Sequence, residues 1–169
     1  MDVIGKARAG PSNEPGLEIE VTRIDYKALS PAQRREFDEF TRCSLQLEED
    51  EPLYHGPNSA DYFATHPLTG QILGYIITTA YGRSRIDITS AYVDHSARRN
   101  GVYTTILRKV VEDILANEAV QRIAAEPINE FLKGSVGKRL DEFVDKGRIK
   151  GYGVGEGVDP DQVLITLKR

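Results

Sequence analysis

The sequence predicts a mixed α/β fold, because segments with the two-residue period of strands alternate along it with segments that have the helical period. The strand pattern is clearest in residues 17–24 (LEIEVTRI), where apolar and polar residues alternate. The helical pattern is clearest in residues 101–117, where apolar residues recur every three or four positions. A chain of 169 residues, 40% of them hydrophobic, is long enough to bury one sizeable core.

Composition excludes several classes of protein. The formal charge is −4 and the pI is near 5.5, which disfavours indiscriminate binding to nucleic acid. Cys43 is the sole cysteine, so neither an internal disulfide nor a cysteine-built zinc site can form. No apolar run reaches the ~20 residues of a membrane helix, and the first residues lack the apolar core of a signal peptide. We therefore expect a cytoplasmic protein that contacts no membrane.

The first half of the chain contains an arm, a strand and a helix. Residues 1–16 hold three Gly and two Pro, so we interpret them as a flexible arm, or alternatively a docking peptide, ahead of a single domain over residues 17–169. Ser30 and Pro31 are typical of a helix start, and the helix is expected to reach Leu47. The acidic run 48–51 then ends it, either as solvated surface or as an anionic mouth for a cationic amine.

The second half alternates strands, turns and helices. We expect a hairpin, then a strand with a bulge near Thr89 and Ser90, then the long helix, and finally a strand, a helix and a terminal hairpin. Apart from the long helix, these segments are 61–66 and 71–81, joined by a turn at 67–70, then 85–93, 121–125, 128–145 and the tail ending in QVLITLKR.

A loop rich in Arg and Gly joins the bulged strand to the long helix, in the order ITSAYV, DHSARRNG, VYTTIL. Such a loop leaves backbone N–H groups free at a helix N-terminus, where the helix dipole adds partial positive charge. Arg98 and Arg99 would add charge-assisted hydrogen bonds, and Gly101 would let a ligand approach the backbone. The loop therefore indicates a phosphate site, unless the arginines are a solvated cap and the glycine only shapes the turn.

Residues 93–103 (VDHSARRNGVY) resemble the acyl-CoA loop of the GNAT superfamily of N-acyltransferases, whose pattern is V-x-P-x-x-R-x-x-G-x-G/A. Val93, Arg98 and Gly101 match the pattern, whereas His95 and Tyr103 depart from it. The order of predicted elements from residue 17 onward is also similar to that family. The resemblance implies a largely antiparallel central sheet of about six to seven strands, with helices on both faces.

The resemblance also implies a function and a set of binding residues. Acetyl-CoA or another acyl-CoA would be the co-substrate, with no metal, and the acyl group would pass directly to a primary amine of a small molecule or protein in a ternary complex. The pantetheine would lie along the bulged strand near Tyr92 and Val93. The pyrophosphate would sit on the backbone amides that follow Arg98, namely those of Arg99, Asn100, Gly101, Val102 and Tyr103.

An amine acceptor calls for a general base. A lysine-like amine with a pKa of about 10.4 is neutral in only about one molecule in 2,500 at pH 7, a penalty of roughly 4.6 kcal/mol. By analogy with the family, Asp87 is the best-placed carboxylate on the bulged strand, and His95 is the alternative. Asp87 could equally be a strand carboxylate on the solvated face.

Three departures from the family weaken the assignment. Tyr103 stands where the family has Gly or Ala, and either fills the pyrophosphate volume or turns aside. Phe143 stands where many members have a proton-donating tyrosine, so that Tyr152, Tyr92 or water would take that role. Val136 stands where the family has an asparagine on the last helix.

Two other functions therefore remain open. A GNAT-fold protein without catalysis would act as a structural or protein-binding module in a larger assembly, and acyl-CoA affinity would distinguish it from an enzyme. The basic residues around the last helix could instead bind nucleic acid, although such charges are usually solvated. An exposed strand edge would make a homodimer plausible.

Overall fold

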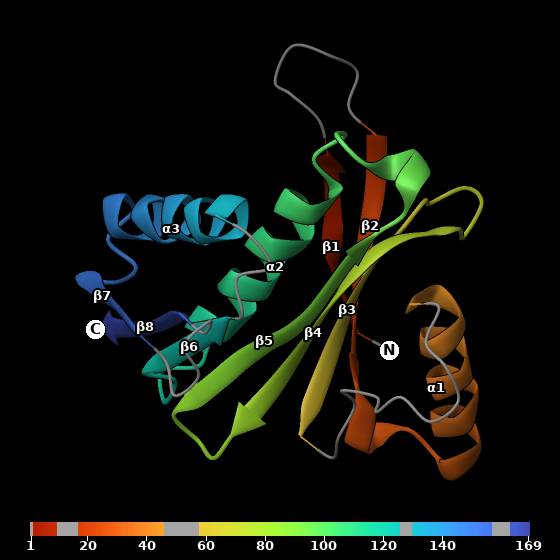
Figure 1. Cartoon of the computed structure of the whole chain (residues 1–169), viewed down its shortest axis with the longest axis horizontal. Helices are drawn as coiled ribbons and strands as arrows, with labels where there is room; N and C mark the ends of the chain where they lie inside the picture. The colour runs from red at the N-terminus through yellow and green to blue at the C-terminus, as the bar shows by residue number, and fades with distance from the viewer. Residues whose placement is uncertain (1, 10–16, 46–57, 126–129, 157–162) are drawn as a thin grey trace.

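The computed structural model describes residues 2–9, 17–45, 58–125, 130–156 and 163–169, which form one eight-stranded sheet and its covering helices (Figure 1). The strands lie in the order β1-β2-β3-β4-β5-β6-β8-β7, and every neighbouring pair is antiparallel except β5 and β6. The strands are β1 (Asp2–Ala9), β2 (Leu17–Asp25), β3 (Ser59–Thr65), β4 (Ile72–Tyr81), β5 (Arg85–Val93), β6 (Arg122–Ala125), β7 (Gly151–Glu156) and β8 (Val163–Lys168). The helices are α1 (Pro31–Leu45), α2 (Val102–Ala116) and α3 (Glu130–Asp145), with 3-10 turns η1 (Tyr26–Ala28) and η2 (His95–Ala97).

Alternation along the strands gives the sheet two buried faces. On β3, Tyr62 belongs to the main core with α2, whereas its neighbour Phe63 belongs to a smaller cluster with Phe37 of α1. Figure 1 accordingly shows α1 and α2 on opposite sides of the sheet. The predicted mixed α/β sheet, largely antiparallel with helices on both faces, is confirmed.

Helix α2 is the centre of the main core. Its buried residues recur every three or four positions, so one face of the helix packs on β1 to β5 while α3 packs beside it. The helix begins at Val102, which is 1% exposed, and Ile106 and Val110 are fully buried. The face of α2 that lies against the sheet is therefore fully packed along the helix.

The expected flexible arm is wrong for residues 2–9, which form β1 and pair with β2 from Asp2↔Arg23 to Ala9↔Leu17. The period-two pattern is hidden there because the register shifts between Val3 and Gly5. As an edge strand, β1 also tolerates a sequence rich in small and polar residues, since one of its two backbone edges needs no partner. Residues 10–16 lie outside the described part of the chain.

Most other predicted elements are found close to their expected bounds. The bulge is confirmed: Ile77 pairs with Ser90 and Thr78 with Ile88, which leaves Thr89 as the extra residue of β5. Helix α1 is described to Leu45, so its predicted end at Leu47 and the acidic run 48–51 lie outside the described residues. No described helix is long and apolar enough to span a bilayer.

Candidate active site

The second half of β5 is paired on one side only within the described residues. Its parallel pairing with β6 runs only from Arg85↔Arg122 to Ile88↔Ala125, whereas its pairing with β4 continues to Val93. Residues 89–93 therefore lack a described strand neighbour on the β6 side, and the bulge at Thr89 falls where β6 ends. Free backbone N–H and C=O groups along such an edge can bind an extended ligand as another strand would.

Close packing holds the other edge of this segment in place. Gly74 of β4 lies so near β5 that an added Cβ would be 2.7 Å from the backbone oxygen of Tyr92 and 3.3 Å from Cα of Val93. Only glycine permits this approach. The rigid side of the segment thus faces β4, and its open side faces the gap beside β6.

The turn after β5 is built from local hydrogen bonds and unusual backbone angles. The Asp94 carboxylate accepts from the amide and the hydroxyl of Ser96, and Arg98 donates from Nε to the backbone oxygen of Val93 at 3.2 Å. Arg99 and Gly101 have φ angles of 68° and 72°, in the left-handed region. That region is strained for Arg99 and natural for Gly101.

This turn leaves the N-terminus of α2 open to an anion. The first helical hydrogen bond is donated by the amide of Thr105 to the backbone oxygen of Gly101 at 3.0 Å. The three preceding amides, of Val102, Tyr103 and Thr104, have no acceptor within the helix. Since a 15-residue helix adds its dipole, these amides form the type of site that binds phosphate groups.

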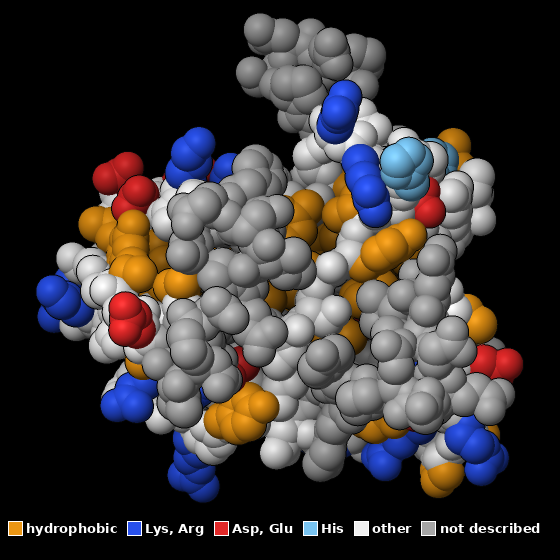
Figure 2. Space-filling model, viewed as in Figure 1, with side chains coloured by type: hydrophobic (Ala, Val, Ile, Leu, Met, Phe, Trp, Pro, Cys, Tyr) orange, Lys and Arg blue, Asp and Glu red, His pale blue; other side chains and the backbone are white. Residues whose placement is uncertain are grey.

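The side chains of the loop lie at the surface around these amides. Arg98, Arg99 and Asn100 are exposed, and His95 is exposed beside them. Figure 2 shows basic and histidine side chains gathered above the turn between β5 and α2. Positive charge is therefore available where an anionic ligand would approach the helix.

Tyr103 packs inward. Its ring lies against the main hydrophobic core, and burial raises the pKa of its phenol to about 12, so the phenol is protonated at neutral pH. This packing favours the interpretation in which the ring turns aside from the amides. The sequence alone left both orientations open.

Asp87 lies on the α1 side of β5, since its neighbours Ile86 and Ile88 face the main core. It is 5% exposed, and Arg85 donates to both carboxylate oxygens at 2.7 Å. A carboxylate has about four lone-pair sites, so two remain to accept a further proton or hydrogen bond. Asp87 is therefore a buried, paired carboxylate and not a carboxylate on a solvated face.

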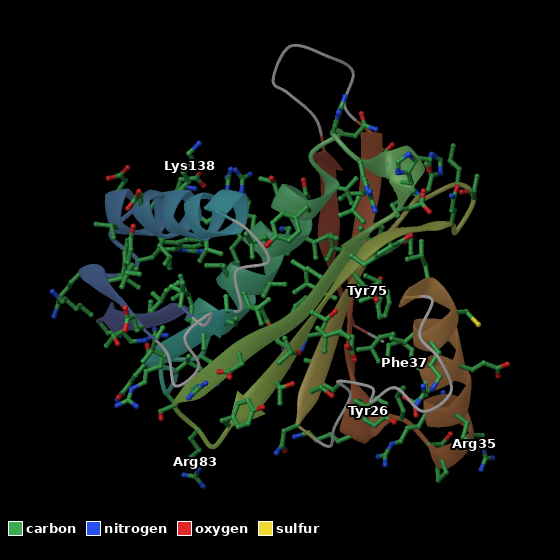
Figure 3. All side chains as sticks on the ribbon, in the orientation of Figure 1. Tyr26, Arg35, Phe37, Tyr75, Arg83 and Lys138 are labelled. Atoms are coloured by element: carbon green, nitrogen blue, oxygen red, sulfur yellow. The ribbon has the colours of Figure 1, made fainter. Side chains whose placement is uncertain are left out.

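An aromatic row lies on the same side of the sheet. The rings of Tyr92 and Tyr75 stack with centroids 5.7 Å apart, and Phe63 and Phe37 continue the row toward α1. Figure 3 shows Tyr75, Phe37 and Tyr26 between the sheet and that helix. The Tyr75 hydroxyl is buried and has no hydrogen-bond partner in the described part of the chain. Tyr92 is thus anchored on one face by a stacked ring.

One alternative proton donor and two positions that depart from the family pattern have structural roles. The Tyr152 hydroxyl donates to the Asp141 carboxylate at 2.6 Å, which raises the pKa of Tyr152 to about 12 and ties β7 to α3. Phe143, 3% exposed, and Val136, 5% exposed, belong to the main core. Tyr152 therefore has a structural partner. Val136 and Phe143, which replace the family's asparagine and tyrosine, are core residues of α3.

Sequence reasoning missed two features of this site. Arg85 could have been identified, because opposite charges two residues apart on a strand share one face. Tyr75 could not, since its place beneath Tyr92 depends on the register between β4 and β5. In the described part of the chain, no group of three or more His, Cys, Asp or Glu could hold a metal ion.

The fold and the site together define a class of protein: a mixed sheet that opens beside a strand, with the unsatisfied first amides of a long helix at the end of that strand. The model of the acetyltransferase (GNAT) family matches residues 3–134, more than three quarters of the chain. The chain belongs to the GNAT acetyltransferase family, and its family supports acyl transfer as its general activity.

Solved structures share this fold at low identity. A putative N-acetyl transferase, YhhK, from E. coli, solved bound to coenzyme A, is 15% identical with a TM-score of 0.50, covering 88% of this chain and 98% of its own. A GNAT-family acetyltransferase from Streptococcus pneumoniae is 17% identical with a TM-score of 0.51, covering 89% of this chain and 100% of its own. A putative acyl-CoA N-acyltransferase from Klebsiella pneumoniae is 12% identical with a TM-score of 0.53, covering 89% of this chain and 98% of its own. No curated protein matches the sequence.

Proposed function

We propose that this protein is an acyl-CoA N-acyltransferase, using acetyl-CoA or another acyl-CoA, that acylates a primary amine of a small molecule or protein. The observation that carries the proposal is the open edge of β5 followed directly by the unsatisfied first amides of α2. An extended chain with a diphosphate group has both features that such a surface would bind. The coenzyme A bound to the E. coli neighbour supports the same choice of ligand.

The chain's own residues divide the binding task. The backbone of Tyr92 and Val93 would hold the pantetheine, and the amides from Arg99 to Tyr103 would hold the pyrophosphate. Arg98 supports the turn through its bond to the oxygen of Val93, because this bond fixes the loop that precedes α2. Acyl-CoA would supply a thioester, at which a C–N bond forms as the C–S bond breaks.

The proton of the attacking amine needs an acceptor, and Asp87 is the candidate general base. It lies about 20 Å along β5 from Val93, near the place where β6 leaves the strand. Arg85 fixes the carboxylate in one orientation while leaving lone pairs free. His95 fits this role less well, because it lies in η2 at the opposite end of β5. Water or Tyr92 would protonate the leaving thiolate.

Calorimetric titration with acetyl-CoA tests the binding half of the proposal. We expect micromolar affinity, about −8 kcal/mol, for the wild type and no binding for the double variant Arg98→Ala, Gly101→Glu. Arg83→Ala is the matched control, since Figure 3 shows Arg83 pointing away from the molecule at the opposite end of β5. If the wild type bound neither acetyl-CoA nor longer acyl-CoAs, the result would contradict the proposal and favour the binding-module alternative.

A screen of amines with detection of free thiol tests the catalytic half. Asp87→Asn keeps the shape of the side chain and loses the base, so we expect about 10²–10⁴-fold lower kcat at neutral pH, with recovery as the pH rises toward the amine pKa. An unchanged rate would remove Asp87 from the mechanism.

The exposed free thiol of Cys43 is compatible with the cytoplasmic location that we propose.

A further inference from the structure

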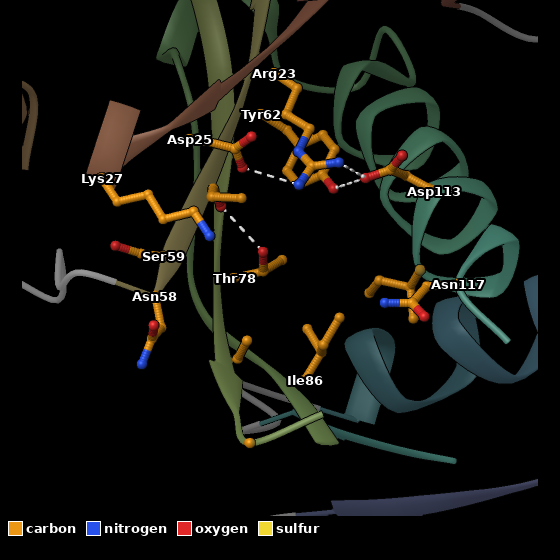
Figure 4. Close-up of a pocket in the computed structure, with 14 residues that line it drawn as sticks. Arg23, Asp25, Lys27, Asn58, Ser59, Tyr62, Thr78, Ile86, Asp113 and Asn117 are labelled. Carbon is orange, nitrogen blue, oxygen red and sulfur yellow. Dashed lines mark hydrogen bonds and ion pairs between the residues drawn. The ribbon is translucent and has the colours of Figure 1, made fainter. Parts of the chain in front are cut away.

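A second concave site lies at the end of α2 that is remote from the loop. It is a cavity of about 400 Å³ between β2, the sheet and the last turn of α2 (Figure 4). Its helix wall is formed by Asp113, Ile114 and Asn117, at least twelve residues from Gly101, or about 18 Å along the helix axis. The cavity is thus separate from the anion-binding turn, and its volume is within the range of small-molecule sites.

The helix wall of this cavity carries an aspartate, Asp113, whose charge is only partly compensated. Arg23 donates to the Asp113 carboxylate at 2.7 Å and to the Asp25 carboxylate at 2.8 Å, so one cation is shared between two anions. The buried hydroxyl of Tyr62 also donates to Asp113, and burial together with this hydrogen bond raises the pKa of Tyr62. All these donors reach Oδ2 of Asp113, and Oδ1 accepts from no residue that the structure describes.

The opposite wall carries positive charge. Lys27 extends from η1 into the cavity in Figure 4, and its ammonium group forms no ion pair or hydrogen bond with any described residue. On the helix wall, Asn117 uses its side-chain oxygen to accept from the amide of Ala119, which leaves its NH₂ group as a donor facing the cavity. The two walls therefore present opposite charges to the same space.

The surface between the two walls carries apolar side chains. It is formed by Ile86, Ile114, Ala60 and Ala80, and Thr78 turns its hydroxyl away to donate to the backbone oxygen of Ala60 at 3.0 Å. An aliphatic group placed there would lose water from its surface, which stabilises binding by about 25 cal/mol per Å². The cavity thus combines an anionic wall, a cationic wall and an apolar floor.

We propose that this cavity binds a small zwitterion with an aliphatic side chain, namely an aliphatic α-amino acid. Its ammonium group would lie against Oδ1 of Asp113 on the helix wall, its carboxylate against Lys27 on the opposite wall, and its side chain over Ile86 and Ile114. A phosphate ion would meet two carboxylates, and a polyamine would meet Lys27 and Arg23. A wholly apolar ligand would leave these charges without compensation for their lost water.

Such a ligand would contact α2 directly, and α2 carries the anion-binding turn at its other end. The binding step does not depend on the proposed acyl transfer, because the two sites share no residue. Failure of one proposal would leave the other standing.

The probe is L-leucine, titrated into the full-length protein and followed by calorimetry and thermal unfolding. Its two halves are the matched probes: isoamylamine lacks the carboxylate, and 4-methylpentanoate lacks the ammonium group. We expect leucine to bind at least tenfold more tightly than either half, since each half leaves one wall unpaired. Inorganic phosphate should not bind competitively.

Two variants locate the site. Lys27→Met removes the cationic wall from an exposed position and should lower leucine affinity at least tenfold without unfolding the protein. Lys138→Met is its control, because Figure 3 shows Lys138 pointing outward from α3. Ile86→Glu tests the floor independently of the ionic network. No leucine binding at 10 mM, equal binding of either half, equal binding by Lys27→Met, or preferential phosphate binding would each overturn the proposal.

Discussion

The two ends of α2, where we propose two binding sites, are built by different means. At its N-terminus the recognition elements are backbone amides, two left-handed residues and a turn whose residues are consecutive in sequence. At its C-terminal end they are side chains gathered from several strands, and Arg23 and Asp113, which form its central ion pair, are 90 positions apart. The first site needs only the correct local conformation, whereas the second needs the correct fold.

A further contact closes the C-terminal end of the helix. Arg169 donates from its guanidinium to the backbone oxygens of Leu115, Asn117 and Val120. The oxygen of Asn117 also accepts from the amide of Val120, and a cation at this position complements the helix dipole. The comparison therefore predicts that changes at the N-terminus alter ligand affinity, while changes at the C-terminal end alter stability first.

The largest effect is expected for Gly101→Val. A β-branched residue at a φ of 72° is strained, and its side chain would lie beside the first amides of α2. We expect acetyl-CoA affinity to fall at least about 100-fold, which corresponds to about 2.7 kcal/mol, as measured by calorimetry. Gly70→Val is the matched control, because Gly70 has a φ of 69° and no atom within 4 Å of its Cβ position. Equal losses in both variants would contradict the role given to Gly101.

The next effect is expected for Asp113→Ala at the other end of the helix. This change leaves the guanidinium of Arg23 and the buried hydroxyl of Tyr62 without their shared acceptor. We expect the free energy of unfolding to fall by about 2 kcal/mol, measured by urea unfolding with an unchanged m value. Glu118→Ala, at an exposed position just beyond the helix, should change it by less than about 0.5 kcal/mol. A loss of acetyl-CoA affinity larger than the loss of stability would refute the separation of the two ends.

A smaller effect is expected for Arg169→Ala, which removes three hydrogen bonds to the end of α2. Because the side chain is only partly buried, we expect about 1 kcal/mol of destabilisation in a thermal unfolding experiment. Arg169→Lys keeps the charge but not the three-pronged geometry, so it should recover only part of this loss. Full recovery by lysine would show that charge alone explains the contact.

The smallest effect concerns pH and the turn before α2. The hydroxyl and then the amide of Ser96 lower the pKa of Asp94 from its ordinary value near 3.8. Since the folded pKa lies below the unfolded one, the stability that this carboxylate contributes is present above the unfolded pKa and is lost as the pH falls through the folded pKa. NMR titration of the Asp94 carboxyl should show this low pKa and a rise in Ser96→Ala; an identical pKa in both proteins would exclude the Ser96 bonds as its cause.

The sequence predicted the elements better than the site. The two-residue and helical periods located seven of the eight described strands and the three helices, because the buried faces impose those periods directly. The strand β1 escaped detection because a bulge interrupts its pattern and an edge position relaxes its composition. In the site, the turn from Asp94 to Gly101 was identifiable because its angles and caps depend on consecutive residues.

Other site features depended on contacts that no local pattern reports. The pairing of Asp87 with Arg85 follows from their shared face, but its burial follows from the strands on either side. Tyr152 was a candidate proton donor by its residue type alone. The packing of β7 against α3 places its hydroxyl where it donates a hydrogen bond to Asp141. The orientation of Tyr103 was decided by the space available in the core.

The sequence by itself therefore determined the class of fold, the bulge in β5 and the turn at the start of α2, because each arises from neighbours along the chain. Only the tertiary structure decided where β6 leaves β5, which tyrosines are occupied, and that Arg23, Lys27 and Asp113 surround one cavity. The physical reason is that hydrogen bonds and ion pairs between side chains form over a few ångströms in space. Folding can bring residues that are far apart in the sequence within that distance.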